Sequence, residues 1–240
     1  MKHLFFLVIV LWSSSLVACP VCKNYSTSDF KIIDASVTHW QELSTTIWEI
    51  KVHGIAGATT PTPAGQLHNA PVLGYVFPTS LAPTDVGFSA TEGIVALALT
   101  SHPDFDDTPL WDENLDQNYN NDGIIWHPHW VVLQKDDRVK GGLSVKQFKK
   151  GDPSIQLPPT NPGMPMFMDS PGFQVITKGN SIKVIIPNYR ISHKTNFKFD
   201  AVAAFMQVNT EQSNLPMLGV YEVYSVLSKD LSLPYKVQLK

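Results

Sequence analysis

The 240-residue chain is poor in cysteine and has none of the common catalytic motifs. Its two cysteines both lie near the N-terminus, so the body of the fold has no disulfide framework and depends on a buried core. The motifs GxSxG, GxxxxGK and HExxH are missing. Their absence argues against the serine hydrolases, P-loop nucleotidases and zinc proteases that these motifs mark, and the catalytic residues, if any, are unknown. No segment after the first 18 residues is apolar enough to be a transmembrane helix.

Basic residues are missing from a large part of the chain. Residues 52–134 contain nine acidic residues and no Lys or Arg, whereas residues 135–240 contain fourteen Lys or Arg against eight acidic residues. Separate domains would more often be balanced individually, so we expect the two parts to face each other in one fold. The basic residues are scattered, which argues against a nucleic-acid partner.

The N-terminus has the pattern of an export signal. Residues 1–18 combine a short positive start with an apolar segment too short to span a bilayer. Leu16–Cys19 resembles the bacterial lipobox, in which the cysteine is lipidated and anchors the mature protein to a membrane. Alternatively, ordinary cleavage leaves Cys19 and Cys22 as a small disulfide or a soft-metal site. Both interpretations predict an exported protein that is periplasmic, on the cell surface or secreted.

The rest of the chain predicts an all-β fold. Short β-branched and aromatic segments alternate with turns rich in Gly and Pro, and no long amphipathic helix is visible. We therefore expect an antiparallel β-sandwich or jelly roll, formed by residues 30–240 as a single domain, with residues 19–29 as a flexible tether. The predicted strands are Phe30–Thr38, Ser44–Gly54, Val72–Phe77, Gly93–Leu99, Ile124–Leu133, Leu143–Phe148, Phe173–Thr177, Ile182–Ile186, Asn196–Val208 and Met217–Val226.

The stretch from Ser101 to Leu133 is the most informative for function. It holds seven acidic residues between Asp104 and Asp122, with no Lys or Arg to neutralise them. Crowded like charges disfavour the compact state, and a bound cation is the simplest compensation. The sequence therefore predicts a metal site but names no reaction.

A loop inside this stretch resembles the first half of DxDxDG calcium loops. In such loops, alternate oxygen-bearing side chains converge on one ion, and Gly permits the sharp turn. Two departures are the Asn in the first position and His129 where a bidentate Glu would stand. The alternative is an Asn-rich turn between two strands. The predicted calcium ligands are Asp116, Asn118, Asn120, Asp122 and the carbonyl of Ile124.

The motif HxH follows this loop. Because residues two apart on a strand point to the same face, His127 and His129 can reach one metal ion, copper or zinc. Pro128 removes a ladder donor and predicts a sheet edge or a bulge. The alternative is that both imidazoles are satisfied structural residues. The predicted further ligands from the same stretch are His102, Asp104, Asp106 and Asp107, and His68 is also plausible.

Three methionines provide a second group of soft donors. Met164, Met166 and Met168 are spaced two apart, and their thioethers suit Cu(I). The alternative is a hydrophobic loop that fills gaps over the core.

These patterns lead to three hypotheses of function. The first is an exported metal-binding protein without turnover, favoured because ligands are plentiful but no catalytic set is recognisable. The second is a metal-dependent oxygenase or hydrolase that uses His127 and His129. The third is a surface module that binds an unknown macromolecule and uses metal only to brace its loops.

Overall fold

The computed structural model describes residue 19, residues 21–104, residue 117 and residues 124–240. Strands dominate this part of the chain, and its only helices are short 3-10 turns: η1 (Val21–Tyr25), η2 (Ser28–Phe30), η3 (Pro83–Val86) and η4 (Asn188–Ile191). None of these helices has the length and hydrophobicity that crossing a membrane requires. The strands are β1 (Ile32–Trp40), β2 (Thr45–Val52), β3 (Pro71–Pro78), β4 (Ile94–Ser101), β5 (His127–Lys135), β6 (Leu143–Val145), β7 (Met168–Asp169), β8 (Val175–Lys178), β9 (Ser181–Pro187), β10 (Lys198–Phe199), β11 (Val202–Val208), β12 (Leu218–Val226), β13 (Tyr235–Lys236) and β14 (Gln238–Leu239).

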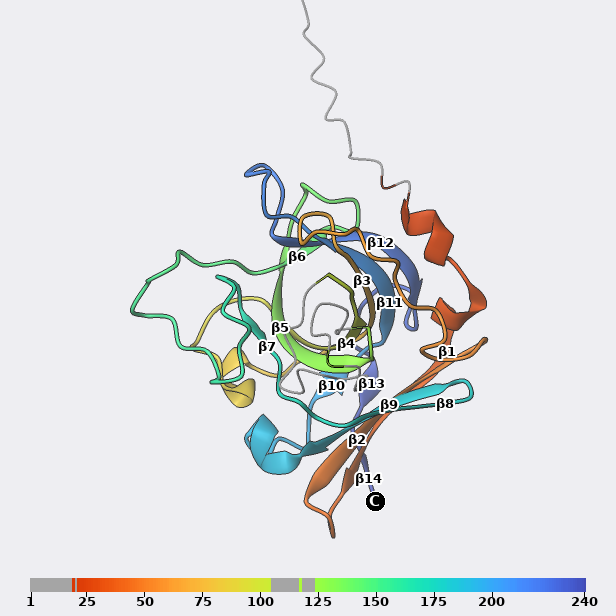
Figure 1. The fold of residues 1–240 in the computed structure, drawn as a ribbon. Helices are drawn as coiled ribbons and strands as arrows, with labels where there is room; N and C mark the ends of the chain where they lie inside the picture. The colour runs from red at the N-terminus through yellow and green to blue at the C-terminus, as the bar shows by residue number, and fades with distance from the viewer. Residues whose placement is uncertain (1–18, 20, 105–116, 118–123) are drawn as a thin grey trace, which may run out of the picture.

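The prediction of an antiparallel all-β unit is confirmed, and the structure specifies its form. One sheet has the order β4-β3-β11-β12-β6-β5 and is closed into a barrel by pairing between β4 and β5, with β7 added along β5. A second sheet has the order β14-β1-β2-β9-β8. It packs against one side of the closed sheet (Figure 1). Around the closed sheet, β5, β4 and β3 lie side by side and come almost wholly from residues 52–134, and β11, β12 and β6 from residues 135–240 form the rest of the ring.

Aromatic side chains fill the space between the two sheets. Trp48 of β2 is fully buried and meets Phe77 of β3 and Trp130 of β5, with ring centroids 5.3 and 5.8 Å away. The alternation predicted for β2 is confirmed, because Trp48, Ile50 and Val52 are buried while Glu49 and Lys51 are partly exposed. This core holds the outer faces of β3, β4 and β5 and leaves their other faces turned to the inside of the closed sheet.

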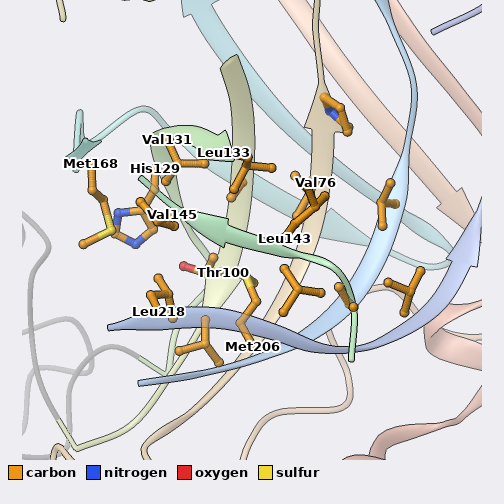
Figure 2. A pocket seen from close by; sticks show the side chains of 18 of the residues that line it. Val76, Thr100, His129, Val131, Leu133, Leu143, Val145, Met168, Met206 and Leu218 are labelled. Carbon is orange, nitrogen blue, oxygen red and sulfur yellow. The ribbon is translucent and has the colours of Figure 1, made fainter. Parts of the chain in front are cut away.

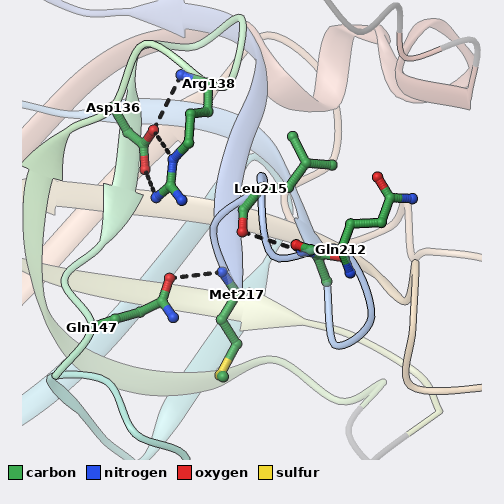
Figure 3. Close-up of polar contacts among 7 residues, drawn as sticks. Asp136, Arg138, Gln147, Gln212, Leu215 and Met217 are labelled. Atoms are coloured by element: carbon green, nitrogen blue, oxygen red, sulfur yellow. Dashed lines mark hydrogen bonds and ion pairs between the residues drawn. The ribbon is translucent and has the colours of Figure 1, made fainter. Parts of the chain in front are cut away.

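Polar contacts fix the turns of the closed sheet. In the turn after β5, both carboxylate oxygens of the buried Asp136 accept hydrogen bonds from the Arg138 guanidinium, at 2.7 and 2.6 Å (Figure 3). The Gln147 side chain accepts a hydrogen bond of 3.0 Å from the Met217 backbone N–H and thereby ties the segment after β6 to the start of β12 (Figure 3).

The N-terminal segment differs from the predicted flexible tether. Cys22 and Tyr25 are buried, and the Tyr25 ring stacks on Phe205 of β11 at 5.7 Å. The Tyr224 hydroxyl donates a 2.7 Å hydrogen bond to the Cys22 carbonyl. Apolar and aromatic side chains thus pack residues 21–30 onto the core, a contact that the polar composition of the segment concealed.

Candidate metal centre

Two adjacent strands of the closed sheet bring three histidines together. In the antiparallel pairing of β4 with β5, Thr100 lies opposite His127, and Ala98 lies opposite His129. His102 follows directly after β4. Because the two strands run side by side, the end of β4 and the start of β5 place three imidazoles at one end of the closed sheet.

The three imidazoles form one compact cluster. His102, His127 and His129 are 2%, 7% and 3% exposed, and one ligand atom from each lies within 4.8 Å of the other two. The Nε2 atoms of His102 and His127 are 2.8 Å apart. Nitrogen ligands around a tetrahedral zinc ion stand about 3.3 Å apart, so small side-chain rotations accommodate an ion between them. The sequence prediction that the HxH motif shares one site is thus supported, and His102 is the third imidazole.

Neighbouring groups orient two of the rings. The Nδ1 of His127 lies 2.6 Å from the Ile125 carbonyl, which can only accept a hydrogen bond, so Nδ1 carries the proton. In the tautomer that carries only this proton, Nε2 of His127 has a lone pair and accepts the 2.8 Å hydrogen bond from Nε2 of His102. The Nδ1 of His129 lies 3.1 Å from the Ser170 hydroxyl next to β7. Such partners fix the tautomer and direction of metal-binding histidines.

The other predicted ligands in the described residues lie elsewhere. The two carboxylate oxygens of Asp104 accept hydrogen bonds from the backbone N–H groups of Ala64 and Gly65, at 2.8 and 2.7 Å. His68 accepts a hydrogen bond from the Thr210 backbone N–H at 3.2 Å. Asp104 therefore braces a loop, and the described cluster consists of imidazoles. Asp106 and Asp107 lie outside the described residues.

Of the five predicted calcium ligands, the structure describes only the Ile124 carbonyl. Asp116, Asn118, Asn120 and Asp122 lie outside the described residues. The Ile124 carbonyl, the predicted backbone ligand, accepts a 2.5 Å hydrogen bond from the Ser101 hydroxyl. The calcium loop stays a prediction.

The methionine motif lies beside the histidine cluster. Met164, Met166 and Met168 all line the cavity inside the closed sheet, together with His102 and His129. Met168 lies opposite Val131 in the pairing of β7 with β5, two residues from His129 on the same face. Figure 2 draws both side chains in the same part of the cavity wall. The fold thus brings the methionine motif into one cavity with two of the three histidines, His102 and His129.

Sequence reasoning missed the cavity itself, which measures about 120 Å³. Its signal is an alternation of size along the strands. On β4, Leu97 and Leu99 face the core between the sheets, while Ala96 and Ala98 face the inside of the closed sheet. Small inward side chains leave space that a uniformly apolar strand pattern does not reveal.

The two N-terminal cysteines form a disulfide, Cys19–Cys22. This pairing corresponds to the second interpretation of the CxxC motif. A thioether-linked lipid on Cys19 and this disulfide exclude each other, and lipidation stays a prediction. Compared with models of protein families, with curated proteins and with solved structures, the chain matches none of them.

Proposed function

We propose that this protein is an exported metal-binding protein that holds one transition-metal ion, copper or zinc, between His102, His127 and His129. The observation that carries the proposal is the convergence of three buried imidazoles, two of them oriented by Nδ1 contacts. Imidazole nitrogens that lie close together in a buried site are stabilised when one ligand interacts with all of them. A metal ion is the ligand that accepts several imidazole lone pairs at once.

Two features favour copper in the form of Cu(I). The methionines of the cavity, Met168 above all, add thioethers to imidazoles, and this donor set suits Cu(I). A monovalent ion also costs less to bury among neutral imidazoles and apolar side chains than a divalent ion does.

Export rests on the N-terminal pattern of residues 1–18 and fits the Cys19–Cys22 disulfide, since disulfides persist outside the reducing cytoplasm. The intact mass of the mature protein distinguishes the two N-termini. An oxidised Cys19–Cys22 pair indicates a protein without a lipid anchor, and an added lipid mass on Cys19 indicates a membrane-anchored one.

The test is elemental analysis of protein purified from the exporting compartment. One equivalent of copper or zinc is expected in the wild type and in a His53→Ala/His193→Ala control, which removes two exposed imidazoles. The His127→Ala/His129→Ala variant should lose that metal. Calcium alone, unchanged in the variant, would make the histidines structural residues, and protein free of any metal would overturn the proposal.

Copper and zinc are separated by a second variant. Met168→Leu keeps the size of the side chain and removes the sulfur. We expect it to weaken Cu(I) binding about tenfold and to leave Zn²⁺ binding unchanged, measured by competition with a chromophoric chelator. Equal effects on both ions would remove the argument for copper.

The second candidate is a metal-dependent oxygenase or hydrolase. It is favoured by one observation, the apolar cavity that begins at His102 and His129. Three protein ligands leave a coordination position for water or substrate, as catalytic sites require. Cobalt-substituted protein whose visible spectrum changes with azide has this open position, and an unchanged spectrum argues for binding alone.

Calcium binding by residues 116–124 is a separate part of the proposal. A chelator selective for calcium should lower the melting temperature, because an ion bound only by the folded state stabilises it. Asp122→Ala should abolish the difference. A melting temperature that the chelator leaves unchanged supports a simple turn.

A further inference from the structure

The inside of the closed sheet encloses an apolar cavity of about 120 Å³. Among the described residues that line it, Thr100, His102 and His129 have polar side chains, and the others are apolar. Figure 2 labels Thr100 and His129 in this wall. The three polar side chains lie together, where β4 ends and β5 begins. The rest of the wall is a continuous hydrocarbon surface.

Small residues that are neighbours across the strands create this space. Gly74 of β3 lies opposite Ala204 of β11, and the next inward pair is Val76 with Val202. On the other side of β3, Ala98 of β4 lies opposite Val76. The wall formed by β4, β3 and β11 therefore carries little side-chain volume near its middle, while the opposite wall carries Val131, Leu133 and Val145.

Met206 occupies part of the interior of the closed sheet, next to Gly74. A Cβ atom at Gly74 would lie 2.6 Å from the terminal methyl of Met206, so a larger residue at this position would displace that methyl. Met206 fills part of the barrel and the cavity is the part left over. Interiors are normally packed without voids larger than a water molecule, so an opening of this size calls for an occupant.

We propose that this cavity is a binding site for a small uncharged hydrocarbon-like molecule of about the size of a benzene ring. Apolar cavities of roughly 150 Å³ in other proteins stay dry and bind benzene. A charged or strongly polar molecule would lose its hydration against the hydrocarbon wall without compensation. The proposal concerns the cavity and holds with or without a metal ion on the histidines.

The test uses fluorobenzene, followed by ¹⁹F NMR with the full-length mature protein, both metal-free and metal-loaded. Saturable binding at one site is expected in both forms. The charged ring 3-fluoro-N-methylpyridinium should not bind. If fluorobenzene binds to neither the metal-free nor the metal-loaded form, or if the cation binds as tightly as fluorobenzene, the proposal is wrong.

Two variants locate the binding site. Ala98→Val and Ala204→Val add methyl groups to the small-residue wall, and each should weaken fluorobenzene binding at least tenfold. Ala90→Val, at an exposed position, should leave it unchanged. Filling space lowers the cost of a cavity, so the two inner variants should unfold at no lower denaturant concentration than the wild type. Fluorobenzene affinity that is equal in all three variants would place its binding outside the cavity and overturn the proposal.

Discussion

At the scale of the residue, the geometry of the histidine cluster depends on the groups that contact the Nδ1 atoms of His127 and His129. The Ile125 carbonyl holds the proton of His127 on Nδ1, and the Ser170 hydroxyl contacts Nδ1 of His129. The first contact leaves Nε2 of His127 facing Nε2 of His102, 2.8 Å away. The sequence predicts the HxH pair from its spacing, but Ser170 lies 41 residues away and no local pattern connects it with the site.

The contact of Ser170 with His129 gives the first prediction. Ser170→Ala should weaken metal binding about tenfold, because partners of this kind are typically worth 10 to 100-fold in affinity. Competition titration with a chromophoric chelator measures the change. The exposed Ser213→Ala variant is the matched control and should bind as the wild type does. Equal affinity in Ser170→Ala would mean that the serine does not orient the ring.

Asp136 provides a prediction of pH dependence. Its pKa is held below the usual range for aspartate, first by the hydrogen bonds from the Arg138 side chain and further by Ser144 and the Arg138 backbone, while burial opposes them. A lowered pKa means that the ionised form stabilises the folded state. This contribution is complete above about pH 4 and is lost as the pH falls through the lower pKa of the folded protein.

Asp136→Asn should therefore lower the free energy of unfolding by about 1 kcal/mol at pH 7, a modest figure because Arg138 is 41% exposed and its charge is screened. The difference from the wild type should be smaller at pH 3 than at pH 7, because the stabilisation is lost as the pH falls toward the lowered pKa of Asp136. Urea unfolding at both pH values measures it, with the exposed Asp137→Asn as control. A difference that grows as the pH falls would show that the pKa is shifted in the opposite direction.

At the scale of the element, the order of the closed sheet decides which residues meet. The strands themselves follow from the pattern of apolar and β-branched residues, and the predicted segments overlap β1 to β6 and β8 to β12, with Asn196–Val208 divided into β10 and β11. Closure does not follow from that pattern, since it requires β4 to pair with both β3 and β5. The meeting of His102 with the HxH motif is a consequence of closure, so the local sequence names the residues without showing that they converge.

Gly93 allows this closure at the start of β4. Its φ is +140°, a region open mainly to glycine, and a Cβ atom there would lie 2.7 Å from the Leu133 carbonyl oxygen of β5. Gly93→Ala should lower the free energy of unfolding by about 3 kcal/mol, since backbone strain and overpacking add. Gly142→Ala, also at positive φ but with open space around it, should cost only about 1 kcal/mol. Equal losses in denaturant unfolding would contradict the close approach of β4 to β5.

At the scale of the whole molecule, the N-terminal segment belongs to the folded unit. The sequence predicts a tether because polar residues dominate Asn24 to Asp29, but Tyr25 among them is buried and stacks on Phe205 of the core. Its hydroxyl also accepts a 3.0 Å hydrogen bond from the Thr62 backbone N–H. A single buried aromatic residue between polar neighbours changes the composition of a segment little, so composition alone does not reveal it.

A chain that begins at Phe30 should therefore unfold more easily than one that begins at Cys19. Loss of the buried Tyr25 alone should cost about 3 kcal/mol, the range for removing a large buried aromatic side chain. The Tyr25→Ala variant of the longer chain separates this effect from the loss of the disulfide. Equal urea midpoints for the two chains would indicate that residues 19–29 are a flexible tether after all.

The central claim is that one metal ion is held by the three histidines, and X-ray absorption of the metal-loaded protein tests it most directly. The fine structure should show three imidazole nitrogens at about 2.0 to 2.1 Å for zinc, with an additional sulfur if the ion is Cu(I). In the His127→Ala/His129→Ala variant this signature should disappear. A spectrum of oxygen ligands alone, or one that is the same in the wild type and the variant, would contradict the account.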